Sequence, residues 1–297
     1  AHANSSTFSA TINQMTNPVA VIDIGSNSVR IRVSCGENVL YRETVTTQPS
    51  KEIQNGMLCY RSINRTLDGL SHLFSIAKEF NAEIFAFATA AVRNSKNGGE
   101  FVALVKEKFG VTIDVVSGDE ESELGIMGAL GNADGIVLDV GGASSEIAVR
   151  LNGKIIYKHS LALGAVTLTD ACGKNYEQSS ALISDKIKEY GAVPDSGTLY
   201  LIGGTATSLA FMLYGDEKYD REKNHGRIIY AEKLEKITRE LFSLTTQEIV
   251  EKYRIQEKRA DIIHSGAALI SAVMNYLKKD SAIVSENDNL EGYLACK

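Results

Sequence analysis

The sequence is poor in proline and cysteine and has no tryptophan. Its 297 residues include three prolines and four cysteines. So few prolines argue against a proline-rich linker. The cysteines lie far apart and form neither a C-x-x-C pair nor a Cys/His cluster, which argues against a structural zinc site and indicates reduced thiols. The four cysteines are Cys35, Cys59, Cys172 and Cys296. Because reduced thiols are typical of the cytoplasm, we expect a cytoplasmic protein.

Long apolar runs and an excess of positive charge are also missing. Polar residues interrupt even the stretch 262–277, whereas a membrane helix needs about 20 consecutive apolar residues. The formal net charge of −6 is opposite in sign to that of a nonspecific nucleic-acid binder. Residues 1–16 lack the regions of a signal peptide and are expected to form a flexible tail. These absences predict a soluble protein with no membrane or nucleic-acid partner, and they leave a locally held polyanion open.

Helical and strand patterns alternate along the rest of the chain. Apolar residues three and four apart predict an amphipathic helix over 61–80. Apolar segments typical of strands and further helical patterns follow it. The mixture indicates an α/β protein. The predicted strands after this helix cover 83–89, 111–116, 153–160 and 198–204, and the predicted helices include 100–109, 118–130, 165–171 and 178–190.

Two segments of the chain resemble each other at a constant offset of 116 residues. The segment VIDIGSNSVRIRV (21–33) aligns with VLDVGGASSEIAV (137–149), and both keep an Asp, a Gly and a Ser at the same places. Each reads as a strand, a Gly/Ser turn and a second strand. Such self-similarity predicts two like domains. The alternative is chance similarity between two strand-turn-strand units.

The turns of these segments are candidates for phosphate binding. Gly/Ser turns expose backbone N–H groups to phosphate oxygens, and a third turn at Gly203-Gly204-Thr205 opens a helix. The alternative is a set of purely structural turns. Asp23 and Asp139 end the first strand of each repeat, where carboxylates suit Mg²⁺ together with phosphate oxygens. Each Asp could instead accept hydrogen bonds from the amides of its turn.

Two further residue types fit phosphoryl chemistry. Glu120 and Glu121 stand at the start of a predicted helix, where the helix dipole stabilises carboxylates, and one of them could orient an attacking water. Arg93 could clamp phosphate oxygens, although an Arg at a strand end is more often a solvated charge. No G-x-x-x-x-G-K-[ST] motif occurs, so the chain has no P-loop.

A series of eight motifs, in order along the chain, resembles the exopolyphosphatase and guanosine pentaphosphate phosphohydrolase family. The resemblance runs from about residue 20 to the end. It implies an α/β fold of two actin-like (ribonuclease-H-like) domains facing each other across a cleft. The motifs are DIGSNSVR (23–30), ATAAVRNSKNG (88–98), SGDEESELGIMGAL (117–130), DVGGASSE (139–146), GGTATSLA (203–210), HG (225–226), RADIIHSGA (259–267) and NLEGYLACK (289–297).

The resemblance also implies roles for individual residues. Glu121 would be the base that activates water, and Asp139 and Glu146 would act around the metal and the attacking water. With Asp23, predicted above from its place at a strand end, they are the expected residues for Mg²⁺ or another divalent cation. The predicted phosphate-binding residues come from the three turns and Arg93. They are Ser26, Asn27, Ser28, Arg93, Gly141, Gly142, Ala143, Ser144, Gly203, Gly204 and Thr205.

The chain departs from the family pattern in three places. Ala143 stands where a third glycine is usual, and the family's Arg-Leu-Gly segment has no counterpart arginine in residues 48–56. The sequence also ends after the two actin-like domains. We expect the first domain to comprise 17–132 with 285–297, and the second to comprise 133–284.

The function implied is Mg²⁺-dependent release of terminal orthophosphate from polyphosphate, guanosine pentaphosphate or both. The partners expected are these polyanions or guanosine tetraphosphate, and a homodimer stays open. An actin-like ATPase or kinase is the first alternative, because one fold serves many functions. A sensor that binds the guanosine nucleotides without hydrolysis is the second, and the presence of Glu121 disfavours it.

Overall fold

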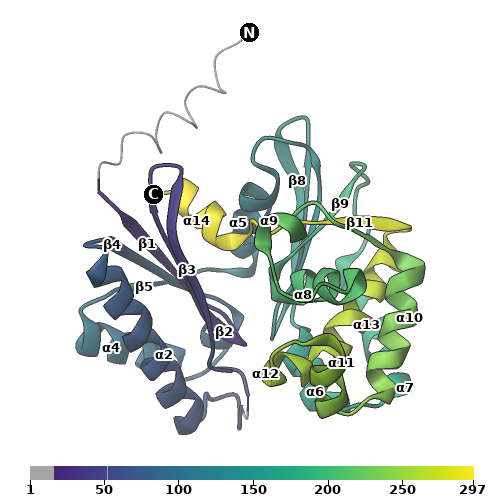
Figure 1. Cartoon of the computed structure of the whole chain (residues 1–297), viewed down its shortest axis with the longest axis horizontal. Helices are drawn as coiled ribbons and strands as arrows, with labels where there is room; N and C mark the ends of the chain where they lie inside the picture. The colour runs from purple at the N-terminus through teal and green to yellow at the C-terminus, as the bar shows by residue number, and fades with distance from the viewer. Residues whose placement is uncertain (1–16, 52) are drawn as a thin grey trace. The chain divides into compact units, whose positions relative to one another are not determined.

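The computed structural model describes residues 17–51 and 53–297, which form two compact units. Unit 1 runs to Ser117 and includes Leu290–Lys297, and unit 2 is Gly118–Asn289. The tail predicted for residues 1–16 lies outside the described residues. Figure 1 shows that each unit has its own sheet with helices packed on it.

Unit 1 is built on a five-stranded sheet in the order β3-β2-β1-β4-β5. The first three strands are antiparallel neighbours, and β4 and β5 run parallel to β1. All six residues of β1 are buried, as expected for a central strand covered on both faces. The strands are β1 (Val19–Ile24), β2 (Ser28–Cys35), β3 (Asn38–Thr46), β4 (Glu83–Ala88) and β5 (Ile113–Val115).

Helices cover both faces of this sheet. Apolar residues of α2 (Tyr60–Glu79) and α4 (Gly98–Phe109) share a buried core with Ala86 and Ala88 of β4. Side chains alternate along a strand, so Phe87 points to the other face. There it stacks on Tyr293 of α14 (Asn289–Ala295), with ring centroids 4.6 Å apart. The short helix α3 (Ala90–Arg93) follows β4.

Unit 2 repeats this sheet and extends it by one strand, in the order β10-β11-β9-β6-β7-β8. Here β6, β7 and β8 are antiparallel neighbours, whereas β9 runs parallel to β6 and β11 parallel to β9. The strands are β6 (Gly135–Val140), β7 (Ser145–Leu151), β8 (Lys154–Leu161), β9 (Leu199–Ile202), β10 (Ile228–Tyr230) and β11 (Ser281–Val284).

The helices of unit 2 also lie on two faces of its sheet. On one face α5 (Gly118–Leu130) buries Ile126 and Leu130 against Val137, Ala148 and Ile202. The other face packs on a larger helical layer. That layer comprises α6 (Ala165–Cys172), α7 (Tyr176–Lys186), the 3-10 helix η1 (Ile187–Tyr190), α8 (Gly203–Tyr214), α10 (Ala231–Ser243), α11 (Thr246–Tyr253), α12 (Glu257–Ala260) and α13 (Ile263–Tyr276). The short helix α9 (Arg221–Asn224) follows α8.

The repeat predicted at an offset of 116 residues is present in the structure. The turn after β1 is closed by Gly25 N–H donating to Ser28 O, and the turn after β6 by Gly141 N–H donating to Ser144 O, each at 3.0 Å. The two sheets share one strand order, in which three antiparallel strands linked by hairpins are followed by two parallel crossover strands. The predicted α/β fold with two actin-like domains is thereby confirmed.

Several boundaries differ from those expected. The helix α5 packs on β6, β7 and β8, so it lies in unit 2, which begins at Gly118, whereas we expected the second domain to begin at residue 133. Residues 285–289 also lie in unit 2. The strand predicted to reach residue 204 ends at Ile202, because Gly203 already begins α8.

Candidate active site

Two buried acids lie side by side at the end of the β6-β7 hairpin. Asp139 and Glu146 are direct partners in the antiparallel register. Residues opposite each other in such a pair project from the same face, with Cβ atoms roughly 5 Å apart. Asp139 is 9% exposed and Glu146 is 2% exposed. Like charges directly opposite one another destabilise a sheet, which makes this pair a candidate functional site.

The surroundings of Glu146 favour its neutral form. Burial raises the pKa of its carboxyl well above the usual range, and the nearby carboxylates of Glu121 and Asp139 raise it further. The hydroxyls of Ser160 and Ser144 act in the opposite direction. Ser160 Oγ donates to Oε1 at 2.7 Å, whereas Oε2 is buried and has no hydrogen-bond partner among the described residues.

Glu121 is the third carboxylate of this neighbourhood. It lies in the first turn of α5 and is 7% exposed. Its helix neighbours differ, because Glu120 is exposed, and Glu123 and Asp119 interact with Lys158 at 2.6 and 3.7 Å. Burial thus distinguishes Glu121, the predicted base, from the other acidic residues of α5.

This carboxylate cluster fits a divalent cation that is shared with a substrate. The described residues contain no group of three or more His, Cys, Asp or Glu that could hold a metal by themselves. Mg²⁺ usually binds through one or two carboxylates, with water and substrate phosphates as its other ligands. The unpartnered Oε2 of Glu146 and the crowding of negative charge suit that arrangement. Asp139 and Glu146 are the residues that would hold the ion.

Asp23 has a different environment from Asp139. In unit 1 the cross-strand partner of Asp23 is Arg30, and Arg30 Nε donates to Asp23 Oδ2 at 2.9 Å. A second contact, from Nη2, completes the ion pair. An internal cation therefore already pairs with Asp23, in contrast to Asp139, and the metal role of Asp23 stays a prediction.

The glycine turn of unit 2 is fixed by the helix that follows β8. The carbonyls of Gly141 and Gly142 accept hydrogen bonds from Ala165 N and Val166 N at 2.9 and 2.7 Å. A Cβ on Gly164 would lie 2.6 Å from the Gly142 carbonyl carbon, so only glycine permits this approach. Ala143 is buried and is absent from the residues with positive φ. The alanine therefore causes no backbone strain, and Ser144 completes the turn.

The third predicted turn forms the first residues of α8. Gly203 has φ +82°, and a Cβ there would lie 2.4 Å from Asp139 Oδ1. Thr205 Oγ1 donates to Val140 O at 3.0 Å, so its proton is committed to the protein. The first N–H groups of a helix have no intrahelical acceptor and attract anions. Gly203, Gly204 and Thr205 can thus offer backbone N–H groups beside the Asp139 carboxylate.

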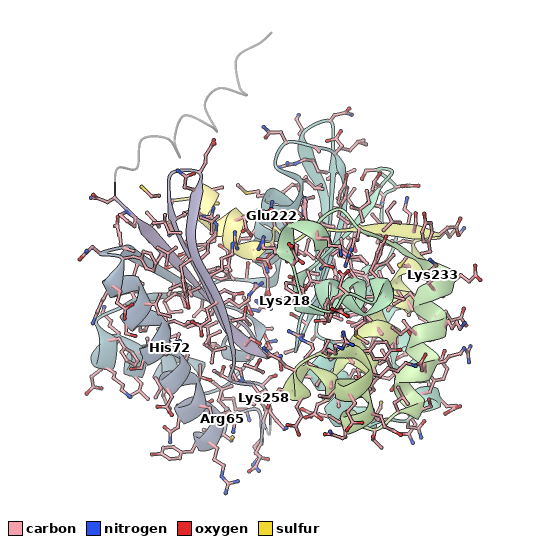
Figure 2. All side chains as sticks on the ribbon, viewed as in Figure 1. Arg65, His72, Lys218, Glu222, Lys233 and Lys258 are labelled. Carbon is pink, nitrogen blue, oxygen red and sulfur yellow. The ribbon has the colours of Figure 1, made fainter. Side chains whose placement is uncertain are left out.

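Arg259 adds a positive charge at this helix start, and the sequence alone assigned it no role. A Cβ on Gly204 would lie 2.4 Å from Arg259 Nη2 and 3.0 Å from Cζ. The guanidinium therefore packs directly on the backbone of Gly204, and Arg with helix N–H groups is a strong oxyanion-binding combination. Its chain neighbour Lys258, labelled in Figure 2, is exposed on the same short helix α12. The sequence did contain a signal for this residue, because Arg259 is the first residue of the family-like motif RADIIHSGA (259–267).

The predicted phosphate-binding residues of unit 1 are engaged in local hydrogen bonds. Ser26 Oγ accepts from Ala91 N at the start of α3 at 3.1 Å, and Asn27 Nδ2 donates to Ser28 Oγ at 3.3 Å. Arg93 is half-buried, and its Nη1 donates to Val116 O at 2.9 Å. The turn and Arg93 are thus held in place within unit 1.

The predicted site residues therefore fall into two groups, one in each unit. Unit 1 contains Asp23, Ser26, Asn27, Ser28 and Arg93, and unit 2 contains Glu121, Asp139, Gly141, Gly142, Ala143, Ser144, Glu146, Gly203, Gly204 and Thr205. Within the described part of the chain, no helix is both long and apolar enough to cross a membrane.

Curated relatives match nearly the whole chain. A bifunctional 3-dehydroquinate synthase/phosphatase of Fusobacterium nucleatum is 28% identical over 304 residues, which cover 92% of this chain. The chain spans 45% of the length of that relative. Exopolyphosphatase 2 of Mycobacterium tuberculosis is also 28% identical, over 309 residues that cover 92% of this chain and 96% of that protein.

Solved structures of similar proteins share the fold. The Ppx/GppA family member of Aquifex aeolicus has a TM-score of 0.77 at 26% identity and covers 94% of this chain and 97% of its own. An exopolyphosphatase of Cytophaga hutchinsonii has a TM-score of 0.84 at 22% identity and covers 94% and 96%. The model of the Ppx/GppA phosphatase family matches residues 32–295, and the chain belongs to this family.

Proposed function

We propose that this protein is a Mg²⁺-dependent exopolyphosphatase that hydrolyses the terminal phosphoanhydride bond of inorganic polyphosphate and releases orthophosphate. Guanosine pentaphosphate ends in the same bond, and we propose it as a second substrate that would yield guanosine tetraphosphate. Family membership supports hydrolase chemistry, and the exopolyphosphatase name of the Mycobacterium tuberculosis relative supports the polymer as substrate.

The observation that carries this proposal is the cluster of Glu121, Asp139 and Glu146 in unit 2. Burial and the nearby carboxylates of Glu121 and Asp139 raise the pKa of Glu146, and its buried Oε2 accepts no hydrogen bond from the described residues; both features favour binding of a cation. The start of α8 and Arg259 lie beside them and favour binding of an anion. A site that takes a cation and an anion together suits a phosphate ester or anhydride with its metal.

In the proposed reaction different residues of unit 2 bind the phosphate, activate the water and bind the cation. The N–H groups at the start of α8 and the guanidinium of Arg259 hold oxygens of the terminal phosphate. Glu121 orients a water molecule for in-line attack and accepts its proton as the bond to the leaving phosphate breaks. Asp139 and Glu146 would hold Mg²⁺, which would neutralise charge on the phosphate. Each turnover consumes one water and shortens the polymer by one phosphate.

Phosphate release from four substrates tests the proposal. Long polyphosphate, short polyphosphate, guanosine pentaphosphate and ATP are compared with Mg²⁺ and with EDTA. We expect Mg²⁺-dependent release from polyphosphate, from guanosine pentaphosphate or from both. Release from ATP alone would identify an ATPase instead, and tight nucleotide binding without release would identify a sensor.

The variant Glu121→Gln tests the assignment of the base. Gln keeps the size of the side chain but cannot accept the proton, so turnover at saturating substrate should fall by about 10²-fold or more. The matched control is Glu120→Gln, because Glu120 is the exposed neighbour in the same helical turn. Equal turnover in the two variants would remove Glu121 from the mechanism.

A further inference from the structure

Asn289 makes a direct contact with the carboxylate of Asp139. It is the first residue of α14 and the last residue of unit 2, and it is 3% exposed. Its Nδ2 donates to Asp139 Oδ2 at 3.1 Å. A buried amide that donates to a carboxylate fixes the orientation of that carboxylate.

The same side chain also touches the helix that carries Glu121. A Cβ on Gly125 of α5 would lie 3.0 Å from Asn289 Oδ1. Residues four apart lie on the same face of a helix, so Gly125 shares a face with Glu121. The Asn289 amide thus lies between Asp139 and the side of α5 that bears the proposed base.

Both oxygens of Asp139 are therefore constrained. Oδ1 packs on Gly203, where a Cβ would lie only 2.4 Å away, and Oδ2 accepts from Asn289. The donor is neutral, so it orients the carboxylate without supplying a positive charge that would compete with a cation. Lysine or arginine at position 289 would orient the carboxylate but would also supply a positive charge that competes with the cation.

The backbone leading to Asn289 is firmly held within unit 2. Ser285 N donates to Leu201 O at 2.9 Å, and Asn224 Nδ2 donates to the buried Glu286 at 2.6 Å. Tyr219 also donates to Glu286, and Arg221 donates to Asn287 Oδ1 at 2.9 Å. These bonds fix the position from which Asn289 reaches Asp139.

We propose that Asn289 is a positioning residue for the cation site: its amide holds Asp139 in the orientation that binds a divalent cation, on the side of α5 that carries Glu121. The inference rests on the proposed function for the part that the cation plays in turnover. Binding of the cation itself can be measured without turnover.

Mn²⁺ is the probe for this test, and two variants disturb the contact. Asn289→Ala removes the amide, and Gly125→Ala adds a methyl group that displaces it. Gly99→Ala is the matched control, because it makes the same substitution in helix α4, where the added methyl group would meet nothing within 4 Å. Tyr276→Phe is the second control, because it removes a tyrosine hydrogen bond to Gly191 O elsewhere in unit 2 and leaves the Asp139 contact in place. Paramagnetic resonance of free Mn²⁺ measures affinity in the full chain, and phosphate release gives kcat and KM.

We expect Asn289→Ala to weaken Mn²⁺ binding about tenfold and to lower kcat by a similar factor, with KM for polyphosphate changed less than about threefold. Gly125→Ala should also weaken Mn²⁺ binding and lower kcat. If Asn289→Ala does not fold, the result for Gly125→Ala decides the test. Both controls should bind Mn²⁺ like the wild type. Mn²⁺ affinity within about twofold of wild type in both Asn289→Ala and Gly125→Ala would overturn the positioning role, whatever their melting temperatures. A wild-type chain that binds Mn²⁺ but releases no phosphate would instead overturn the proposed function.

Discussion

Asp139 pairs across the β6-β7 hairpin with Glu146, whereas the equivalent Asp23 of unit 1 pairs across β1-β2 with Arg30. The two hairpins have the same register and the same turn hydrogen bond, so the pairs differ mainly in the sign of one charge. Unit 1 thereby neutralises its aspartate internally. Unit 2 keeps two acids together, and Glu146 forms no ion pair among the described residues.

The variant Glu146→Gln should be more stable than the wild type when divalent cations are removed. The pKa of Glu146 is raised by burial and then by Glu121 and Asp139, so its ionisation at neutral pH costs folding free energy. Gln removes that charge and can still accept the hydrogen bond from Ser160. We expect a gain of roughly 1–3 kcal/mol in the free energy of unfolding in EDTA, with loss of phosphate release in Mg²⁺. Urea unfolding in EDTA measures the gain.

Glu123→Gln is the control for this charge effect. Glu123 is only half-buried and pairs with Lys158, so its neutralisation should give no gain in EDTA. A Glu146→Gln variant that is no more stable than wild type, or that keeps full activity, would contradict the assignment of Glu146.

Gly203→Ala should abolish phosphate release. The added methyl group would lie 2.4 Å from Asp139 Oδ1, and φ of +82° is unfavourable for alanine, so the carboxylate or the start of α8 must move. Gly215→Ala is the matched control at the other end of α8. Gly215 also has positive φ, at +67°, but its Cβ would meet nothing within 4 Å. It should lose about 1–2 kcal/mol of stability and keep its activity. Equal activity losses in the two variants would show that backbone strain, and not the contact with Asp139, is responsible.

The repeated hairpin could be predicted from the sequence because its evidence is local. Asp, Gly and Ser recur at fixed positions within a few residues of one another, and their turn chemistry determines the hairpin. The alignment of the two segments already matches Arg30 in the first with Glu146 in the second. The difference in charge between the two hairpins could therefore also have been recognised from the sequence. The strands β3, β10 and β11 were not predicted, because they are short or lie at or near a sheet edge.

Arg259 and Asn289 could not be placed from the sequence. Asn289 is 150 residues from Asp139, and Arg259 is 55 residues from Gly204. Their contacts depend on how α12 and the segment after β11 return to the sheet, which no local pattern specifies. The orientation of Thr205 could not be predicted either, because its hydroxyl donates to Val140 O of β6, which is 65 residues away in the sequence.

Acid should destabilise the fold through His264. The side chain is fully buried, and burial lowers its pKa from 6.5 to about 4. The unfolded chain takes up this proton near pH 6.5 and the folded chain only near pH 4, so stability falls as the pH drops through this window. The loss should reach about 3 kcal/mol at pH 4. Urea unfolding of wild type and His264→Gln across pH 4–7 measures it, and the variant should show a shallower slope. Parallel slopes would assign the acid sensitivity to other groups.

Arg259→Ala should weaken binding of the terminal phosphate. The guanidinium packs on the backbone of Gly204 at the start of α8, where it can donate to the same anion as the helix N–H groups. Hydrogen bonds between charged groups contribute about 1.5–3 kcal/mol, so KM for polyphosphate should rise by roughly 10- to 100-fold. Arg259→Lys should recover only part of this loss, because a single ammonium cannot bind two oxygens in the same geometry. The control Arg239→Ala removes an exposed arginine of α10 that pairs with Glu235, and it should leave KM unchanged. If Arg259→Ala and Arg239→Ala raise KM equally, long-range attraction of the polyanion accounts for the effect, and Arg259 does not contact the phosphate.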